Sequence, residues 1–313
     1  MKKNFFKSNI NLVMICAGAL GCLIIICLFF YEDIFTTSNS INSNDKPQKL
    51  FFNYHPTYLL SLANAILQGV IWWILIFPAT VIISSVRNEF KERPRVWPTL
   101  LVLLIALAIV LIALGSTIFQ YVTPPMSAFN HNDVKDAIFI GLAISTGFCF
   151  LFGIVMIGKL CIRKIESGTY DVTEYKRLRS YQDSLLSFTG IILSLGVISS
   201  ILYRKAFIEA GGASYEYPEE FVVMFGFINT LLMLIFYLPN YFIIDNYGKR
   251  IVAFKYPLED EKKELVTTNF EQQEILSKNL KLDMTFIESV KKIGIILSPI
   301  LSSFLAQLFD LFK

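Results

Sequence analysis

Cysteine and histidine are the residue types in this chain that could bind a metal or carry redox chemistry. The chain contains Cys16, Cys22, Cys27, Cys149, Cys161, His55 and His131. No two cysteines have the C-x-x-C spacing of a zinc or redox motif, and neither histidine lies near a cysteine in the sequence. All five cysteines fall in or beside apolar runs, where a disulfide framework is not expected. The sequence therefore predicts no metal site, no cofactor and no disulfide.

Motifs of known catalytic sites are absent from the sequence as well. The chain has no H-E-x-x-H, no P-loop, no G-x-S-x-G, and no G-x-G-x-x-G followed by an acidic residue. The middles of its long apolar runs also lack charged residues, which proton-coupled pumps, intramembrane metalloproteases and voltage sensors need there. We therefore expect no catalytic residue and no enzyme activity.

Uncharged polar residues at helical spacing are the first candidates for a functional surface. Ser61, Asn64, Gln68 and Trp72 recur every three or four residues, so they share one face of a helix. Such a face can line a narrow aqueous path if several copies surround an axis. It can equally hold helices together through interhelical hydrogen bonds, which contribute about 0.6–2 kcal/mol each. The sequence leaves both interpretations, a pore and a packing surface, open.

A basic run formed by Lys176, Arg177 and Arg179 precedes another apolar segment. Basic residues beside a membrane attract anionic lipid headgroups at about 1 kcal/mol each. The run is thus a candidate contact for lipid or a partner protein, although ordinary topology determination explains the same residues. No aromatic residues interleave with it as on a nucleic-acid-binding face, so direct nucleic-acid binding is not expected.

The composition indicates what kind of element must position these residues. Of the 313 residues, 54% are hydrophobic and 17% are charged, and the mean hydropathy is +0.56. A soluble domain has roughly 25% charged residues. Six apolar runs are long enough to cross about 30 Å of hydrocarbon as helices. They cover residues 11–30, 59–86, 100–119, 137–157, 185–202 and 221–244. We expect an all-α integral membrane protein, with a transmembrane domain of three helical hairpins over residues 1–244.

The charges between these runs predict an orientation. Lysine and arginine gather at the N-terminus and after the second, fourth and sixth runs, whereas the other loops are richer in aspartate and glutamate. By the positive-inside rule, both termini are cytoplasmic. The bias towards Asn, Lys, Ile and Phe is typical of an AT-rich bacterial gene. The expected location is therefore the bacterial inner membrane, with a multi-pass topology.

Residues 245–313 are predicted to form a cytoplasmic tail. The pair Ile251-Val252 favours a short strand over residues 251–254. Two Thr-x-x-Glu sequences, at Thr268 and Thr285, have the spacing of a capping box and predict helix starts at these points. The second of these helices, over about residues 286–312, is amphipathic.

The apolar stripe of this last helix is a candidate contact for a partner or for a second copy. It consists of Ile293, Ile296, Leu297, Ile300, Leu301, Phe304, Leu305 and Leu308. Ser298, Ser302 and Ser303 lie on the other face. Three arrangements fit this pattern: packing against the protein's own cytoplasmic face or a partner subunit, an in-plane helix at the membrane surface, or a seventh span kinked at Pro299. The sequence does not decide among them.

These observations favour a non-enzymatic membrane effector or sensor. Such a protein can be oligomeric and pore-forming, with the lipid bilayer, further copies or a soluble cytoplasmic protein as its partners. Bacterial stress, immunity and phage-defence systems use proteins of this kind. A small-solute transporter or channel is the alternative, because of the uncharged polar stripe, and a scaffold subunit of a membrane complex is a further one.

Overall fold

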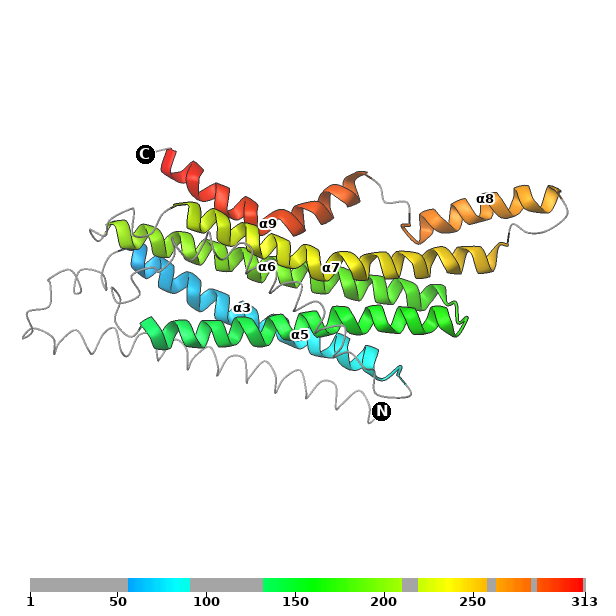
Figure 1. Cartoon of the computed structure of the whole chain (residues 1–313), viewed down its shortest axis with the longest axis horizontal. Helices are drawn as coiled ribbons and strands as arrows, with labels where there is room; N and C mark the ends of the chain where they lie inside the picture. Colours follow the sequence, from blue (N-terminus) through cyan, green and yellow to red (C-terminus); the bar gives the residue numbers. More distant parts are fainter. Residues whose placement is uncertain (1–55, 91–131, 210–218, 258–262, 283–285, 312–313) are drawn as a thin grey trace, which may run out of the picture.

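The computed structural model describes residues 56–90, 132–209, 219–257, 263–282 and 286–311 (Figure 1). Within these ranges the chain forms six helices and no β-strand. They are α3 (Pro56–Arg87), α5 (Asn132–Glu166), α6 (Val172–Glu209), α7 (Glu219–Lys255), α8 (Lys263–Asn279) and α9 (Phe286–Leu311). The predicted all-α class is confirmed for this part of the chain. The expected spans 11–30 and 100–119 lie outside the described residues.

Among the described residues, three helices are long and apolar enough to cross a membrane. They are Ile66–Arg87 within α3, Val172–Ala206 within α6 and Glu219–Lys255, the whole of α7. These segments overlap the predicted spans 59–86, 185–202 and 221–244. The predicted span 137–157 lies inside the helix α5. The six-span topology itself stays a prediction.

Two local predictions about the tail are wrong. Residues 251–254 are not a strand, because α7 continues as a helix to Lys255. Ile251 and Val252 are buried in the core, and burial at helical spacing overrides the strand preference of β-branched residues. Thr268 does not begin a helix either, since α8 already starts at Lys263. The start predicted from Thr285 is correct, because α9 begins at the next residue, Phe286.

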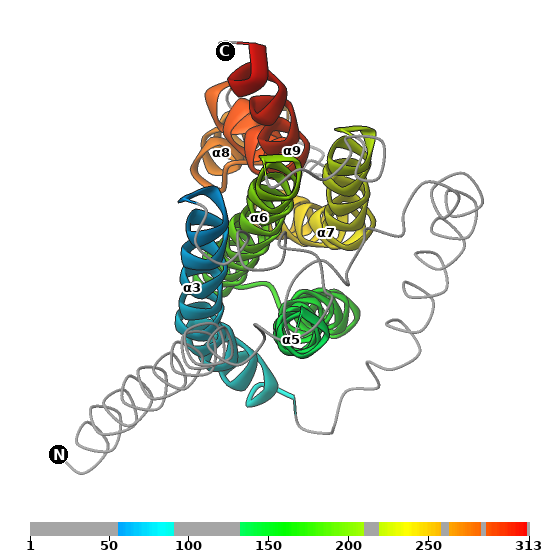
Figure 2. The ribbon, with the colours of Figure 1, turned by 90° about the vertical axis from the view of Figure 1, so that its left-hand side faces the viewer.

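Helix α6 is the central element of the bundle. It contacts α3, α5, α7 and α9. Helix α8 packs mainly against α7. Figure 2 shows α6 between α3 and α7, with α5 below it and α9 above it. The main core lies between α3, α5, α6 and α7, and its fully buried side chains include Leu160, Leu185 and Ile244. The candidate site residues described below lie on α6 or on helices that contact it.

The turn between α5 and α6 is specified by local sequence. Gly168 has a φ of 63°, and the amides of Gly168 and Thr169 donate to the carbonyls of Ile165 (3.2 Å) and Lys164 (3.0 Å). This is the Schellman arrangement that ends helices at glycine. Asp171 then caps α6, because its Oδ1 accepts a hydrogen bond from the Thr173 amide (2.8 Å). The turn brings the charged residues at both ends of this hairpin together.

Candidate functional site

The polar stripe of α3 faces α6. Asn64 Nδ2 donates a hydrogen bond to Ser199 Oγ (2.7 Å), and Ser199 Oγ donates to Gln68 Oε1 (2.9 Å). Gln68 is 5% exposed, and Trp72 packs in the main core. The side chain of Ser61 lies outside the described part of the structure. Asn64 and Gln68 thus take part in the interhelical hydrogen bonding that the packing interpretation requires. Whether an assembled form uses this face as a pore stays a prediction.

The three residues of the basic run have different surroundings. Lys176 is exposed to solvent. Arg177 forms an ion pair with Glu89, at the end of α3, and its Nη2 lies 3.9 Å from Glu174 Oε1. Arg179 is 7% exposed and points into the bundle. The run is therefore not one uniform basic surface, and its members cannot contact the same ligand in the same way.

Arg177 belongs to a charged cluster where α3, α5 and α6 meet. Lys164 Nζ lies 2.8 Å from Glu174 Oε2, and a cavity of about 320 Å³ is lined by Glu89, Lys164, Asp171, Thr173, Glu174 and Arg177. Burial and the neighbouring Glu174 carboxyl together raise the pKa of Glu89 to about 7, against the lowering effect of Arg177 and Lys164. The cluster thus connects α3 to the α5–α6 hairpin through a carboxyl group that titrates near neutral pH.

Helix α9 packs in the groove between α6 and α7. Two glycines allow this close approach. A Cβ atom at Gly190 of α6 would lie 2.9 Å from Ile295 Cγ2, and one at Gly226 of α7 would lie 2.8 Å from the Pro299 carbonyl oxygen. Small residues at such positions let helix backbones approach in a membrane, where the hydrophobic effect does not drive helices together. The contact therefore depends on shape and on polar groups.

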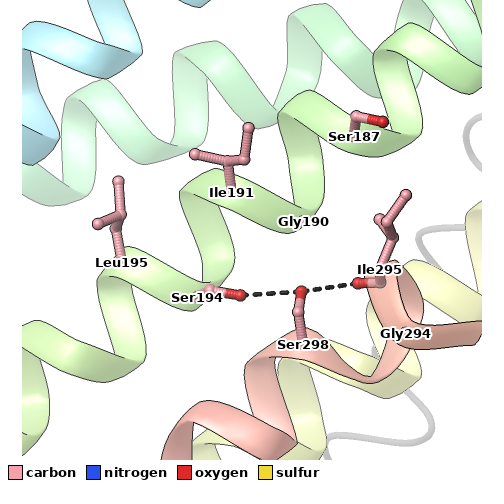
Figure 3. Close-up of a pocket in the computed structure, with 8 residues that line it drawn as sticks. All are labelled: Ser187, Gly190, Ile191, Ser194, Leu195, Gly294, Ile295 and Ser298. Carbon is pink, nitrogen blue, oxygen red and sulfur yellow. Dashed lines mark hydrogen bonds between the residues drawn. The ribbon is translucent and has the colours of Figure 1, made fainter. Parts of the chain in front are cut away.

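A bend in the middle of α9 lies at this contact (Figure 1). Pro299 has no amide hydrogen, so the Ile295 carbonyl loses its helical partner. Ser298 Oγ donates to this carbonyl (2.7 Å) and accepts a hydrogen bond from Ser194 Oγ of α6 (2.9 Å), as Figure 3 shows. The same residues border a groove of about 520 Å³ between α6 and α9, lined by Ser187, Gly190, Ile191, Ser194, Leu195, Gly294, Ile295 and Ser298. The bend is thus built into the interface with α6.

The apolar stripe of α9 does not face the bundle as a unit. Ile296 is 8% exposed, and Ser302 and Ser303 are buried beside it, whereas Ile293, Leu301 and Phe304 are about half exposed. Leu297 and Ile300 are half-buried. The side chains of Leu305 and Leu308 lie outside the described part of the structure. Helix α9 packs against α6 and α7 of the protein itself, through a mixed face that contains the serines. That this contact lies on the cytoplasmic side stays a prediction.

A charged junction holds the first half of α9. Lys292 Nζ forms an ion pair with Asp183 Oδ1 of α6 (2.8 Å) and lies 5.6 Å from the centroid of the Tyr241 ring of α7. The guanidinium carbon of Arg179 lies 4.6 Å from the same ring centroid. Both distances are in the range of cation–π contacts. We call Arg179, Asp183, Tyr241 and Lys292 the α6–α7–α9 junction. It joins three helices through two cations and one carboxylate.

Sequence reasoning missed Asp183, Lys292, Tyr241 and Glu89. Asp183 lies just before the apolar run that begins at residue 185, and Lys292 lies at the start of the last amphipathic stretch. Charges at the ends of apolar runs are usually topology signals, and nothing in the spacing links two positions so far apart. The sequence signal that could have indicated this contact is the opposite charge of Asp183 and Lys292. Opposite charges can form an ion pair once α9 packs against α6.

The junction and the Glu89 cluster contain no arrangement that resembles a metal centre. Within the described residues, no group of three or more histidine, cysteine, aspartate and glutamate side chains could hold a metal ion. Cys161 is buried, and burial raises the pKa of its thiol. No protein-family model, curated protein or solved structure matches this chain. The functional argument therefore rests on the geometry alone.

Proposed function

We propose that this protein is a non-enzymatic, multi-pass effector or sensor of the bacterial inner membrane, and that α9 is its responsive element. The single observation that supports this proposal is how α9 is attached. Among the described residues, it contacts α6 and α7 through the Lys292–Asp183 ion pair, the Ser194–Ser298 hydrogen bond, close approaches at two glycines and an apolar cluster around Ile296, while several of its large apolar side chains remain exposed.

Such an attachment is suited to reversible release. Interhelical hydrogen bonds in membrane proteins contribute about 0.6 kcal/mol on average, and partly exposed ion pairs contribute about 0–1 kcal/mol. Burial of apolar side chains adds little within a bilayer, because lipid chains are as apolar as the protein core. A change in charge at Asp183 or Lys292 is therefore large compared with what holds α9 in place.

The exposed side of α9 suggests what a released helix does. Ile293, Leu301 and Phe304 are about half exposed. Side chains of this kind pack equally well against lipid or against the same helix of a second copy. We propose that movement of α9 exchanges its intramolecular contact for one between copies, and that this assembly changes membrane permeability. A stress, immunity or phage-defence role is the proposed setting.

Membrane potential is the measurement that tests this function. Cells expressing the protein would be followed with a potential-sensitive dye, for the unaltered chain, for Asp183→Lys, for Lys292→Asp and for the doubly exchanged variant. If α9 regulates permeability, each single exchange depolarises the cells and the double exchange restores the potential. Glu274→Lys is the matched control, because it breaks the exposed Glu274–Lys278 pair of α8 (2.6 Å) without touching α9.

Other results would assign another role. An unchanged potential in every variant, with a soluble protein that co-purifies in fixed ratio, would make the chain a sensor or scaffold that recruits the active component. Saturable flux of a neutral solute into proteoliposomes, lost in Asn64→Leu or Gln68→Leu, would favour a transporter. Equal survival of cells with and without the gene under phage challenge would remove the defence setting.

A further inference from the structure

Arg179 is buried with unbonded guanidinium nitrogens. Its side chain is 7% exposed, and neither Nη1 nor Nη2 has a hydrogen-bond partner among the described residues. The Tyr241 ring and the Asp183 carboxylate, one turn further along α6, are close enough to stabilise its charge. A buried guanidinium normally satisfies its donors with hydrogen bonds as well as with a nearby charge. The Nη donors therefore have no acceptor among the described residues.

Further unused hydrogen-bonding groups surround this guanidinium. Gln182, one turn along α6, is completely buried, and neither its Nε2 nor its Oε1 is bonded. The hydroxyls of Tyr175 and Tyr237 are buried and unbonded as well. Tyr237 of α7 is close enough to Arg179 to interact with it electrostatically. Nearly all of these groups can donate, and a set of donors around a cation suits an anion.

The charges of the junction do not balance. Lys292 takes Asp183 as its partner, and Asp245 is engaged by Lys249 (2.8 Å). Arg179 and Lys292 thus share one carboxylate, that of Asp183, so the junction has an excess positive charge. A guanidinium presents two parallel donors, which match the oxygens of a phosphate group. Arg179 also lies shortly before the apolar run 185–202, and basic residues beside a membrane attract the phosphates of anionic lipids.

We propose that the α6–α7–α9 junction is a phosphate-binding site, in which the Arg179 guanidinium holds two oxygens of a phosphate group and the Gln182 amide donates to a third. Lys292 reaches this site from α9, because its ammonium group and the Arg179 guanidinium lie over the same Tyr241 ring. The anion enters on this side by displacing the Lys292 side chain. The phosphate comes from a lipid headgroup or from free phosphate. The inference does not depend on the proposed function.

The test is the melting temperature of the delipidated full-length protein in an uncharged detergent. Three probes are added at constant ionic strength: inorganic phosphate, phosphatidylglycerol, and diacylglycerol, which has the same chains without phosphate. A ligand at about 100 times its Kd is expected to raise the melting temperature by roughly 5 °C. Arg179→Gln should abolish this rise. Lys176→Gln, which removes the same charge from an exposed neighbour on α6, should retain it.

Two patterns would support the site and name its source. A rise with phosphatidylglycerol alone assigns a lipid headgroup, and a rise with inorganic phosphate as well assigns a free anion. No rise with either probe, an equal rise with diacylglycerol, or an equal loss in Lys176→Gln would overturn the proposal. If Arg179→Gln does not fold, native mass spectrometry of the unaltered protein decides, because the proposal requires a phosphate-bearing adduct that Arg179→Lys holds less tightly.

Discussion

Helix α6 has two buried polar regions, and they differ in how their polar groups are satisfied. Towards its C-terminal end, Ser199 bridges Asn64 and Gln68 of α3 in a continuous set of hydrogen bonds. Towards its N-terminal end, Arg179 and Gln182 are buried against α7 with no hydrogen bond to any described residue. The polar groups of the first region are uncharged and hydrogen-bonded. Those of the second region include charged groups, and several of them have no hydrogen bond.

This difference indicates which region is structural. A buried polar group that is bonded contributes modestly to stability, whereas one that is left without a partner costs about 1–3 kcal/mol. The buried polar groups between α3 and α6 are therefore accounted for by helix packing. Helix packing does not account for those of the α6–α7–α9 junction, and the free-energy cost of leaving them unbonded is the reason to look there for a ligand. The following predictions test this contrast, from the largest expected effect to the smallest.

Asp183→Asn is expected to have the largest effect. It removes the carboxylate that pairs with Lys292, so two cations remain around the Tyr241 ring. Breaking a fully buried pair costs about 3–5 kcal/mol, and partial exposure reduces this to about 2 kcal/mol. Thermal unfolding followed by circular dichroism measures the loss, and added phosphate should recover part of it. Glu274→Gln, at an exposed pair on α8, should leave the unfolding temperature unchanged.

Gln182→Met should stabilise the protein in phosphate-free detergent. The substitution replaces two buried, unbonded polar atoms with an apolar group of similar shape, which is expected to raise the free energy of unfolding by about 1–2 kcal/mol. The same unfolding measurement applies. A loss of stability would mean that Gln182 is satisfied in solution, and the contrast between the two regions would then fail.

Gln68→Leu should destabilise the protein, in contrast to Gln182→Met. It leaves the Ser199 hydroxyl without its acceptor and should lower the free energy of unfolding by about 1 kcal/mol. A double-mutant cycle with Ser199→Ala isolates the interaction, for which we expect a coupling energy of about 0.6–1.7 kcal/mol. Coupling near zero would show that the bonded stripe does not hold α3 to α6.

The smallest effect is a pH dependence that comes from Glu89. Its pKa is raised from the model-peptide value of 4.5 to about 7, so the folded protein binds more protons than the unfolded chain between these values. Stability from this group is therefore fully present below pH 4.5 and declines as the pH rises to about 7. Glu89→Gln should flatten this part of the pH profile of the unfolding temperature, while Glu166→Gln, an exposed control, should not. A profile unchanged by Glu89→Gln would contradict the burial of this carboxyl.

The sequence predicted correctly those features that depend on a single helix. Helical spacing predicted the shared face of Asn64 and Gln68, and apolar length predicted the helices that overlap residues 59–86, 185–202 and 221–244. The capping spacing at Thr285 located the start of α9 correctly. The strand predicted at 251–254 is wrong because the packing of α7 in the core overrides the local strand preference of the β-branched pair.

The tertiary structure alone decided which polar groups are satisfied. Lys176, Arg177 and Arg179 are alike in the sequence, yet one is exposed, one pairs with Glu89 and one is buried with unbonded guanidinium nitrogens. Composition and spacing determined an apolar helical protein, because burial of apolar runs and backbone hydrogen bonding act within each segment. The partner of a charge lies more than a hundred residues away, as for Asp183 and Lys292, and only the packing of α9 against α6 brings such groups together.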